Sequence, residues 1–472
     1  MNISEFELKK VYSEASGSTS VVDSNIKMKL NKNGLYEEVI VDSDKELNDL
    51  VPFVSPNLND RITETEIADQ LYENIENIDY DERLGYYSSL YVGYVNEGEF
   101  RKDASSGGMG TWIFKELFEE DMIDYVLHVK KNENSNDKRL FKYDVSTSIE
   151  EIRDGAKTKY YPVEISELMD TVKNTPGRYA VIGIPSFIYS IRLLAKVDEV
   201  INERIKYTVG LVCGHQKSAK FAESMAWQVG IEPGNLIDID FRHKLLDRPA
   251  SSYAVKMTGR IDGELQTIIK PTSELFGLNW GWGFFKPVAS NFTDDVFNET
   301  ADIVLGDAWL PEYASDSKGN NIVIVRNSDI DQLVKDAIQE NRLKMDAVDN
   351  ETIFASQVSH YRHTHDELAY RLYVKDIENE WRPEKRVRAS SNISDTRRKI
   401  QDLRKIISEQ SHIQYQEAVQ RNDFNYFVEN MTEYTSEYTE LYRSINRKSL
   451  LNRVLRMSPK EFTGKVINRL LR

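Results

Sequence analysis

Short apolar runs alternate with amphipathic stretches through the middle of the chain, from about residue 88 to 330. Continuous apolar runs predict strands that are covered on both faces, whereas apolar positions three and four residues apart predict helices. Strands are expected at 90–95, 125–129, 179–184, 207–213, 303–305 and 322–325. Helices are expected at 111–120, 187–195 and 218–229. This alternation favours an α/β fold with a mainly parallel sheet core.

The two ends of the chain follow other patterns. Before residue 61, brief apolar stretches lie between turn-rich pieces, and Asn33-Gly34 predicts a β-hairpin between 26–30 and 36–41. The acidic stretch 61–84 indicates a linker or a helix. After about residue 330 no strand pattern is evident, and helices are expected at 395–417 and 426–445. The last part of the chain is therefore predicted to be a helical C-terminal extension.

Composition excludes several classes of protein. The chain has 472 residues and one cysteine, which can neither hold an iron–sulfur cluster nor form an internal disulfide. Its hydrophobic fraction of 40% and charged fraction of 29% are ordinary for a soluble globular protein. The formal net charge of −16 argues against a nucleic-acid partner. Because the N-terminus lacks an apolar signal stretch and the apolar run 179–191 is too short to span a bilayer, a cytoplasmic location is expected.

The C-terminal residues 440–472 depart from this acidic average. They hold nine basic residues against two acidic ones, a net charge of +7, so the remainder carries −23. Apolar residues gather at 450–455 and 466–471, as in basic amphipathic helices that bind the anionic inner face of a membrane. Packing on the acidic body, on a partner enzyme or on a second copy in a homo-oligomer is the open alternative.

The clearest local signal is the segment RKDASSGGMG at 101–110, directly before an expected helix. Consecutive small residues there would expose backbone N–H groups, and the helix dipole would favour an anion. The guanidinium of Arg101 could add a bidentate hydrogen-bonded contact to a phosphate. The spacing matches neither the P-loop nor the dinucleotide fingerprint, so a simple glycine-rich turn is the alternative.

Three further segments carry candidate chemistry. Cys213–Ser218 (CGHQKS) closes a buried strand and opens a helix, a position where α/β sheets place ligands, although Ser218 could simply cap the helix. Asp307 ends another strand and is either functional or a turn cap. Lys157–Tyr160 (KTKY) adds two cations beside a tyrosine. The HYRHTH cluster, with histidines at 360, 363 and 365, lacks the spacing of a metal site, and no metal is predicted.

Six segments together resemble the coenzyme F-420 (deazaflavin) hydrogenase/dehydrogenase beta-subunit family. They are RKDASSGGMGTWIF, GAKTKYYPV, YAVIGIPSFIYSIRLL, VGLVCGHQKSAKF, IDIDFRHK and ETADIVLGDAW, in this order within residues 95–330. The later segments RHTHDELAYRLY, WRPEKRV and ISEQSH resemble the branch found among bacterial surface-polysaccharide synthesis proteins.

The resemblance implies FAD as cofactor and assigns candidate residues. The candidate flavin-binding residues are Arg101, Ser105, Ser106, Gly107, Gly108, Lys159 and Tyr160. The candidate catalytic residues, His215, Cys213, Asp307 and Lys217, come instead from the strand-end segments described above. Family members also carry cysteine-ligated clusters, but this chain has other residues where the pattern has cysteines. Those positions are Ser13, Ser16, Thr19, Asp23, Ser55, Ser186, Ser290 and Thr293. Because hydroxyl groups do not replace thiolates as cluster ligands, no iron–sulfur cluster is expected.

Four segments follow from the pattern and the resemblance. They are a degenerate ferredoxin-like segment (1–60), an N-terminal beta-subunit-family domain with the SSGG loop (61–165), a C-terminal α/β domain (166–345) and a helical extension with a basic tail (346–472).

The leading functional hypothesis is a cluster-free, FAD-dependent oxidoreductase of bacterial surface-polysaccharide synthesis that acts on a small-molecule or lipid-linked sugar. FAD alone accepts hydride, so clusters are not chemically required. Two alternatives stay open: a degenerate family member that binds or regulates in the same pathway, and a glycan-modifying enzyme that uses a sugar nucleotide.

Overall fold

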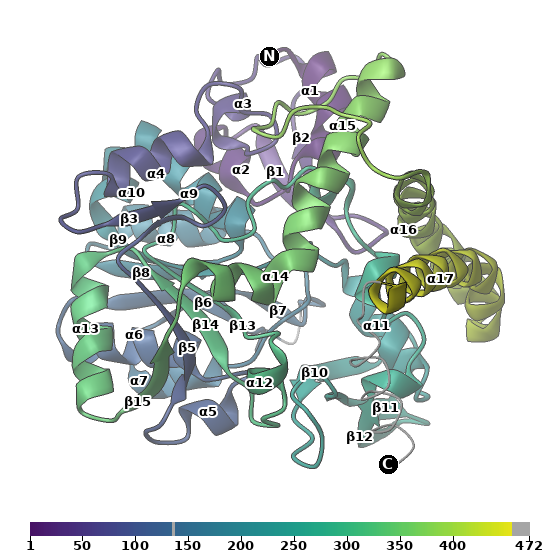
Figure 1. Ribbon diagram of the computed structural model, residues 1–472. Coiled ribbons are helices and arrows are strands. Elements are labelled where there is room, and N and C mark those ends of the chain that lie inside the picture. The colour runs from purple at the N-terminus through teal and green to yellow at the C-terminus, as the bar shows by residue number, and fades with distance from the viewer. Residues whose placement is uncertain (135–136, 456–472) are drawn as a thin grey trace, which may run out of the picture.

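A mixed eight-stranded sheet forms the centre of the protein (Figure 1). The computed structural model describes residues 1–134 and 137–455, with side chains to residue 447. The strands, in sheet order, are β15 (Leu343–Ala347), β5 (Ser89–Val95), β14 (Asn321–Val325), β13 (Ile303–Asp307), β9 (Ile205–Leu211), β8 (Tyr179–Gly183), β6 (Tyr125–Lys131) and β7 (Phe141–Ser146). The four strands β13, β9, β8 and β6 pair in parallel, and antiparallel strands flank them. The predicted α/β fold with a parallel core is confirmed.

Helices cover both faces of this sheet. On one face, α6 (Met109–Glu119) and α13 (Ser328–Gln339) bury Trp112, Leu117 and Val334 against the strands. On the other, α8 (Ser166–Asn174), α9 (Pro185–Val197), α10 (Glu199–Arg204) and α14 (Asn350–Thr364) bury residues such as Met169 and Ile188. Full burial of each such side chain stabilises the fold by roughly 1.5–3 kcal/mol. The short helices α5 (Phe100–Asp103), α7 (Ile149–Asp154) and α12 (Pro311–Ala314) lie at the strand ends.

The N-terminal segment is a separate small layer at the top of Figure 1, with α1 (Ile3–Lys9), η1 (Lys10–Tyr12), α2 (Ser18–Val22) and α3 (Val51–Val54). The predicted hairpin is confirmed as β1 (Ile26–Leu30) paired with β2 (Tyr36–Ile40). Of the two readings of 61–84, the helix is confirmed at α4 (Glu64–Tyr72), which starts with a capping box between Thr63 and Glu66. The hairpin β3 (Asp79–Asp81) and β4 (Gly85–Tyr87) follows.

A second, three-stranded sheet lies beside the main one. It contains β10 (Leu236–His243), β11 (Ala254–Ile261) and β12 (Glu264–Pro271), and short 3₁₀ turns η2 (Thr272–Glu274), η3 (Trp280–Trp282) and η4 (Val288–Asn291) follow it. Together with α11 (Ala219–Trp227), this unit packs on the C-terminal helices through aromatic side chains such as Phe241, Phe284 and Tyr415. These strands were not expected from the sequence.

The C-terminal extension is helical, as predicted, with α15 (Asp366–Ile377), α16 (Asp395–Arg421) and α17 (Phe424–Leu455). The expectation that no strand follows residue 330 is wrong, because β15 pairs with β5 at the sheet edge. Gly93 makes this approach possible, since a Cβ there would lie 1.9 Å from the carbonyl oxygen of Lys344. Residues 456–472, most of the predicted basic tail, lie outside the described residues. None of the helices within the described ranges combines the length and the hydropathy that a membrane span requires.

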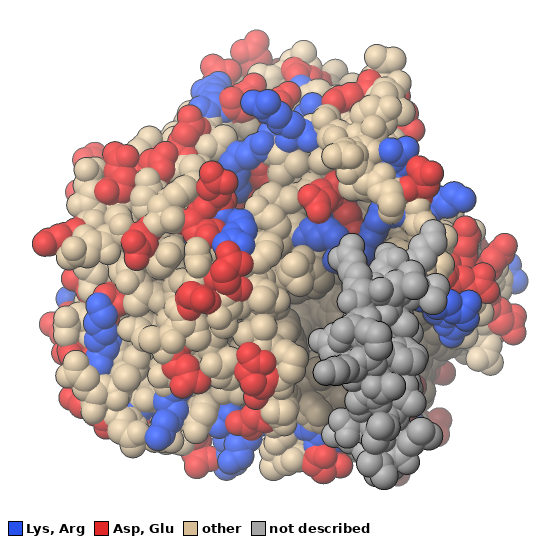
Figure 2. Space-filling view, in the orientation of Figure 1, with Lys and Arg blue, Asp and Glu red and all other residues tan. Residues whose placement is uncertain are grey.

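Acidic and basic side chains are interspersed over the face shown in Figure 2, without a single basic field.

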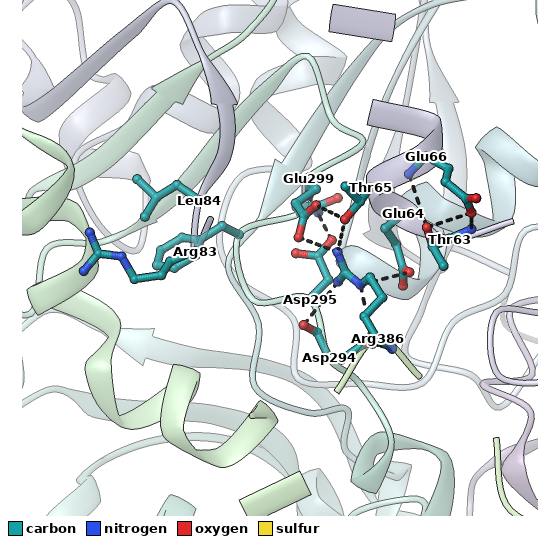
Figure 3. A network of polar contacts seen from close by, with 12 residues as sticks. Thr63, Glu64, Thr65, Glu66, Arg83, Leu84, Asp294, Asp295, Glu299 and Arg386 are labelled. Carbon is teal, nitrogen blue, oxygen red and sulfur yellow. Dashed lines mark hydrogen bonds and ion pairs between the residues drawn. The ribbon is translucent and has the colours of Figure 1, made fainter. Parts of the chain in front are cut away.

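One buried ion-pair network joins the helical extension to the α/β core (Figure 3). Arg386, between α15 and α16, places Nη1 2.6 Å from Oε1 of Glu299 and donates to the hydroxyl of Thr65 at 2.8 Å. Its Nε lies 3.5 Å from Asp294 and 3.7 Å from Glu64. Burial alone would lower the pKa of Arg386, but these carboxylates outweigh it and hold the pKa well above its usual value. This cation therefore balances several carboxylates that would otherwise repel one another.

We expect Asp295, which borders this network, to make the protein less stable as the pH rises. Burial, with the neighbouring Glu299, raises the pKa of Asp295 to about 8. Between its unfolded pKa near 4 and pH 8, the unfolded state releases this proton while the folded state keeps it, so alkaline pH favours unfolding by up to about 1.4 kcal/mol per pH unit. Asp295→Asn should remove this dependence and stabilise the protein at pH 8 more than at pH 5.

Urea unfolding at pH 5, 6.5 and 8 measures the effect. The exposed Asp60 offers the control variant Asp60→Asn, whose pH profile should follow the wild type. A profile for Asp295→Asn that is parallel to the wild type would contradict the prediction.

Candidate functional site

A cavity of about 310 Å³ lies at the carboxyl ends of the parallel strands β8, β9 and β13. Gly183, Leu211 and Asp307, the last residues of these strands, all line it. Ligands of open α/β sheets bind at this edge because parallel strands bring their loops together there. Of the residues predicted from the sequence, Ser105, Ser106, Gly108, Lys159, Tyr160, Cys213, His215, Lys217 and Asp307 line this one cavity.

The glycine-rich loop leads into α6, whose first turn forms one wall. Gly108 is the N-cap at φ 98°, a left-handed conformation that favours glycine, and the first N–H of α6, that of Met109, donates to Oδ1 of Asn321 at 3.3 Å. Gly110 and Thr111, in the first turn of α6, line the cavity. Since the first-turn N–H groups of a helix lack intrahelical acceptors, this wall suits an anion.

The two serines of the loop make hydrogen bonds that fix the loop to neighbouring segments. Ser105 accepts a hydrogen bond from the backbone N–H of Thr158 at 2.9 Å, and Ser106 donates to the carbonyl of Asn320 at 2.9 Å. Lys244 also donates to the carbonyl of Ser106, at 2.8 Å. The loop is thus tied to the neighbouring segments that complete the cavity, and its hydroxyls already have partners within the protein.

Two predicted flavin-site residues have a different place. Arg101 does not line the cavity: its guanidinium donates to the carbonyl of Gly319, pairs with Asp316 at 2.6 Å and lies 3.4 Å from the ring centre of Tyr94. Gly107 packs so closely that a Cβ would lie 2.6 Å from Oδ1 of Asn321. Both residues pack against neighbouring segments of the protein, and the phosphate contact of Arg101 stays a prediction.

The KTKY segment forms a second wall. Lys159 donates to the carbonyls of Gly155, at 2.8 Å, and of Ala156 and Lys157, and burial lowers its pKa to about 8. Tyr160 is packed edge-on against Trp280, at 4.7 Å between ring centres, and against Phe241. Burial raises the pKa of its hydroxyl above the usual value, so it stays neutral.

Residues 213–217 form the third wall. Burial raises the pKa of the Cys213 thiol to about 11, so the thiol stays protonated at neutral pH and is no nucleophile there. Burial and the nearby Lys217 hold the pKa of His215 well below its usual value, and its Nε2 has no hydrogen-bond partner among the described residues. Burial lowers the pKa of Lys217 to about 7, and its Nζ donates to the carbonyl of Phe284 at 2.6 Å. The capping role of Ser218 is confirmed, since its hydroxyl accepts from the N–H of Lys220.

The sequence reasoning missed Arg242, the partner of Asp307. Its Nη1 lies 2.5 Å from Oδ2 of Asp307, and its guanidinium stands 5.0 Å from the ring centre of Tyr253. Arg242 belongs to the IDIDFRHK segment, so the signal was present, but β10 was not expected and nothing placed that segment at the cavity. His128, whose pKa burial lowers to about 3, and Tyr143 were also missed.

The three histidines of HYRHTH have separate partners. His360 contacts Gln357 at 2.9 Å, His363 lies 3.0 Å from Glu367, and His365 stacks on Tyr361.

Two family models match this chain, and both describe the beta subunit of coenzyme F420 hydrogenase/dehydrogenase. The model of the N-terminal part matches residues 90–170, and the model of the C-terminal part matches residues 177–351. No curated protein sequence matches significantly. Among solved structures, a chain in the F420-reducing [NiFe] hydrogenase complex from Methanosarcina barkeri is similar, with 16% identity and a TM-score of 0.47, over 66% of this chain and 99% of that chain.

Proposed function

This chain belongs to the coenzyme F420 hydrogenase/dehydrogenase beta-subunit family, and from that premise we propose that it is a flavin-dependent oxidoreductase that binds FAD in the cavity at β8, β9 and β13. The observation that carries the proposal is the meeting of the first turn of α6 with basic side chains in one cavity. Lys159, Lys217 and Arg242 line the cavity with the first turn of α6, and Asp307 is the only carboxylate among its described lining residues. This donor set fits a pyrophosphate.

When bound, FAD supplies hydride transfer. Around it, Tyr160 offers a neutral aromatic wall, and Lys217 can hold or release a proton at Nζ near neutral pH because burial lowers its pKa to about 7. Cys213 contributes apolar packing as a protonated thiol. His215, neutral and with Nε2 unpartnered, can accept or donate one hydrogen bond to a substrate.

The N-terminal segment supports a cluster-free mode of action. Ser13 donates to the buried carboxyl of Glu38 at 2.6 Å, and Thr19 to the same oxygen at 3.3 Å. Ser16 and Ser190 are hydrogen-bonded at 3.0 Å. Three positions that the family resemblance gives to cysteines thus make hydroxyl–carboxyl or hydroxyl–hydroxyl contacts. We further propose a bacterial surface-polysaccharide substrate, a sugar that is free or lipid-linked, and a cytoplasmic location with the basic tail docking to the inner membrane face or to a partner enzyme.

FAD uptake tests the proposal. The purified full-length protein should show flavin absorption, or take up added FAD with quenching of its fluorescence, and should bind FAD on the order of tenfold or more tightly than riboflavin, which lacks phosphate. A colourless protein that takes up no FAD would contradict the proposal and favour a binding or regulatory role.

A further inference from the structure

A second, larger cavity of about 680 Å³ lies between the N-terminal segment and the C-terminal helices. Residues of η1, of the β1–β2 hairpin, of the stretch from Lys286 to Phe292, and of α15 and α16 line it. Figure 1 shows the N-terminal segment beside α15. A volume of this size accommodates a nucleotide-sized molecule. Much of the wall comes from α15 and α16, outside the residues matched by the family models.

Buried cations gather on one side of this cavity. Lys286 is 3% exposed and Arg404 is 8% exposed, and Arg371 of α15 lines the cavity beside them. Along α16, Gln401, Arg404 and Ser408 follow at spacings of three and four residues and therefore share the face turned to the cavity.

These cations have almost no anionic partners. The guanidinium of Arg371 donates to the carbonyl of Asn291 at 2.8 Å and to Oε1 of Gln401 at 2.9 Å, and Lys286 donates to the side chain of Asn291. Within the described residues, no carboxylate lies within 4 Å of Lys286 or Arg371. Burial, with Arg404 and Arg371 close by, holds the pKa of Lys286 well below its usual value, as expected for uncompensated charge.

The nearest carboxylate is already shared. Glu367 lies 3.8 Å from Arg404, but it also lies 3.3 Å from Arg397 and 3.0 Å from His363. In addition, Nε of Arg404 and Nε2 of Gln401 are buried without a hydrogen-bond partner among the described residues. Donors that are buried but unused cost free energy unless a ligand accepts from them.

The acidic side chains of the cavity do not cancel this charge. Burial raises the pKa of Glu14 to about 8, so Glu14 is largely protonated at neutral pH, and burial also raises the pKa of Glu38. Glu7, Asp402 and Glu409 are exposed at the rim, as is Lys405, and Glu7 pairs with Lys10 at 2.7 Å. Glu37 also lines the cavity and is half-buried. Solvent and salt screen such rim charges far more than buried ones.

We propose that this cavity binds a diphosphate-bearing small molecule, with its phosphates on Lys286, Arg371 and Arg404 and its organic part toward Tyr12 and Phe292. A diphosphate fits better than a single carboxylate because three basic side chains line this wall, and among the described residues only Arg404 has a carboxylate, Glu367, within 4 Å. A bound polyanion would also favour the protonated form of Lys286, which burial disfavours. The inference goes beyond the flavin proposal and stands without it. Because Gln216 lines both cavities, a ligand bound here lies next to the first cavity.

Calorimetric titration of the full-length protein with inorganic pyrophosphate, UDP and glucuronate tests this inference. Pyrophosphate and UDP should bind, with UDP the tighter, and glucuronate should bind at least tenfold more weakly. Lys286→Met and Arg404→Gln should each weaken UDP binding tenfold or more. Lys405→Met, at the exposed rim of the same helix, should change it less than about twofold.

Thermal unfolding without ligand separates a binding role from a structural one. Lys286→Met should keep or raise the midpoint, because it removes a buried amine that has no carboxylate partner among the described residues, and it should leave FAD uptake unchanged. Absence of pyrophosphate and UDP binding by the wild type, equal binding by the wild type and both cavity variants, or glucuronate binding as tight as UDP would each overturn the inference.

Discussion

Replacing Arg386 by glutamine is expected to lower the free energy of unfolding by about 3–5 kcal/mol, because the change leaves buried carboxylates without their cation. Arg386 contacts Glu299 at 2.6 Å and Asp294 at 3.5 Å, and its backbone N–H also donates to Asp294 at 3.0 Å. The only other cation near Asp294 among the described residues is Lys385, at 3.8 Å. Repulsion among the carboxylates should then open the contact between the extension and the core.

Chemical unfolding of the full-length protein, followed by tryptophan fluorescence, measures this loss. Arg382, four residues earlier, provides a matched control, since its ion pair with Asp376 at 2.6 Å involves a more exposed carboxylate. Arg382→Gln should cost less than about 1 kcal/mol. If the two variants lost similar stability, the ion-pair network in Figure 3 would not join the helical extension to the α/β core as we describe.

Much of the main sheet could be predicted because its central strands are covered on both faces. The runs at 179–184 and 322–325 are apolar without interruption, and helix starts such as Pro185 and Ser218 are marked by their residue types. The strands that were missed are edge or half-exposed ones. In β15, Leu343 and Met345 alternate with Lys344 and Asp346, a pattern too short to separate from a helix.

The candidate site could be located from its strand ends and its glycine loop, but its charge balance could not. Asp307 was found because it ends a buried strand, whereas its partner Arg242 lies in β10, a strand that the sequence pattern did not predict. The same holds for the basic residues of the larger cavity. Lys286, Arg371 and Arg404 lie far apart in the sequence, and only tertiary packing brings them to one cavity.

Replacing Gly108 by alanine is expected to weaken FAD binding roughly tenfold to a hundredfold and to destabilise the start of α6. At φ 98°, any other residue is strained by about 1–2 kcal/mol. A Cβ would also lie 2.9 Å from the backbone N of Arg101 and 2.9 Å from the carbonyl carbon of Phe100, and backbone atoms cannot move aside as a flexible side chain does. The first turn of α6 must shift instead, so charge-assisted hydrogen bonds from its N–H groups to a pyrophosphate would be lost, each worth about 1.5–3 kcal/mol.

Gly234→Ala is the control variant, because it introduces the backbone strain of a positive φ without the steric clash that a Cβ at Gly108 would cause. Gly234 has a similar φ of 86°, but nothing lies within 4 Å of its Cβ position and it does not line the cavity. Its alanine variant should therefore lose stability through strain alone and bind FAD as the wild type does. Fluorescence titration of FAD against the wild type and both variants measures the effect on binding. If Gly108→Ala bound FAD normally while unfolding more easily, the glycine-rich loop would have a structural role only. The pyrophosphate would then have to bind elsewhere in the cavity.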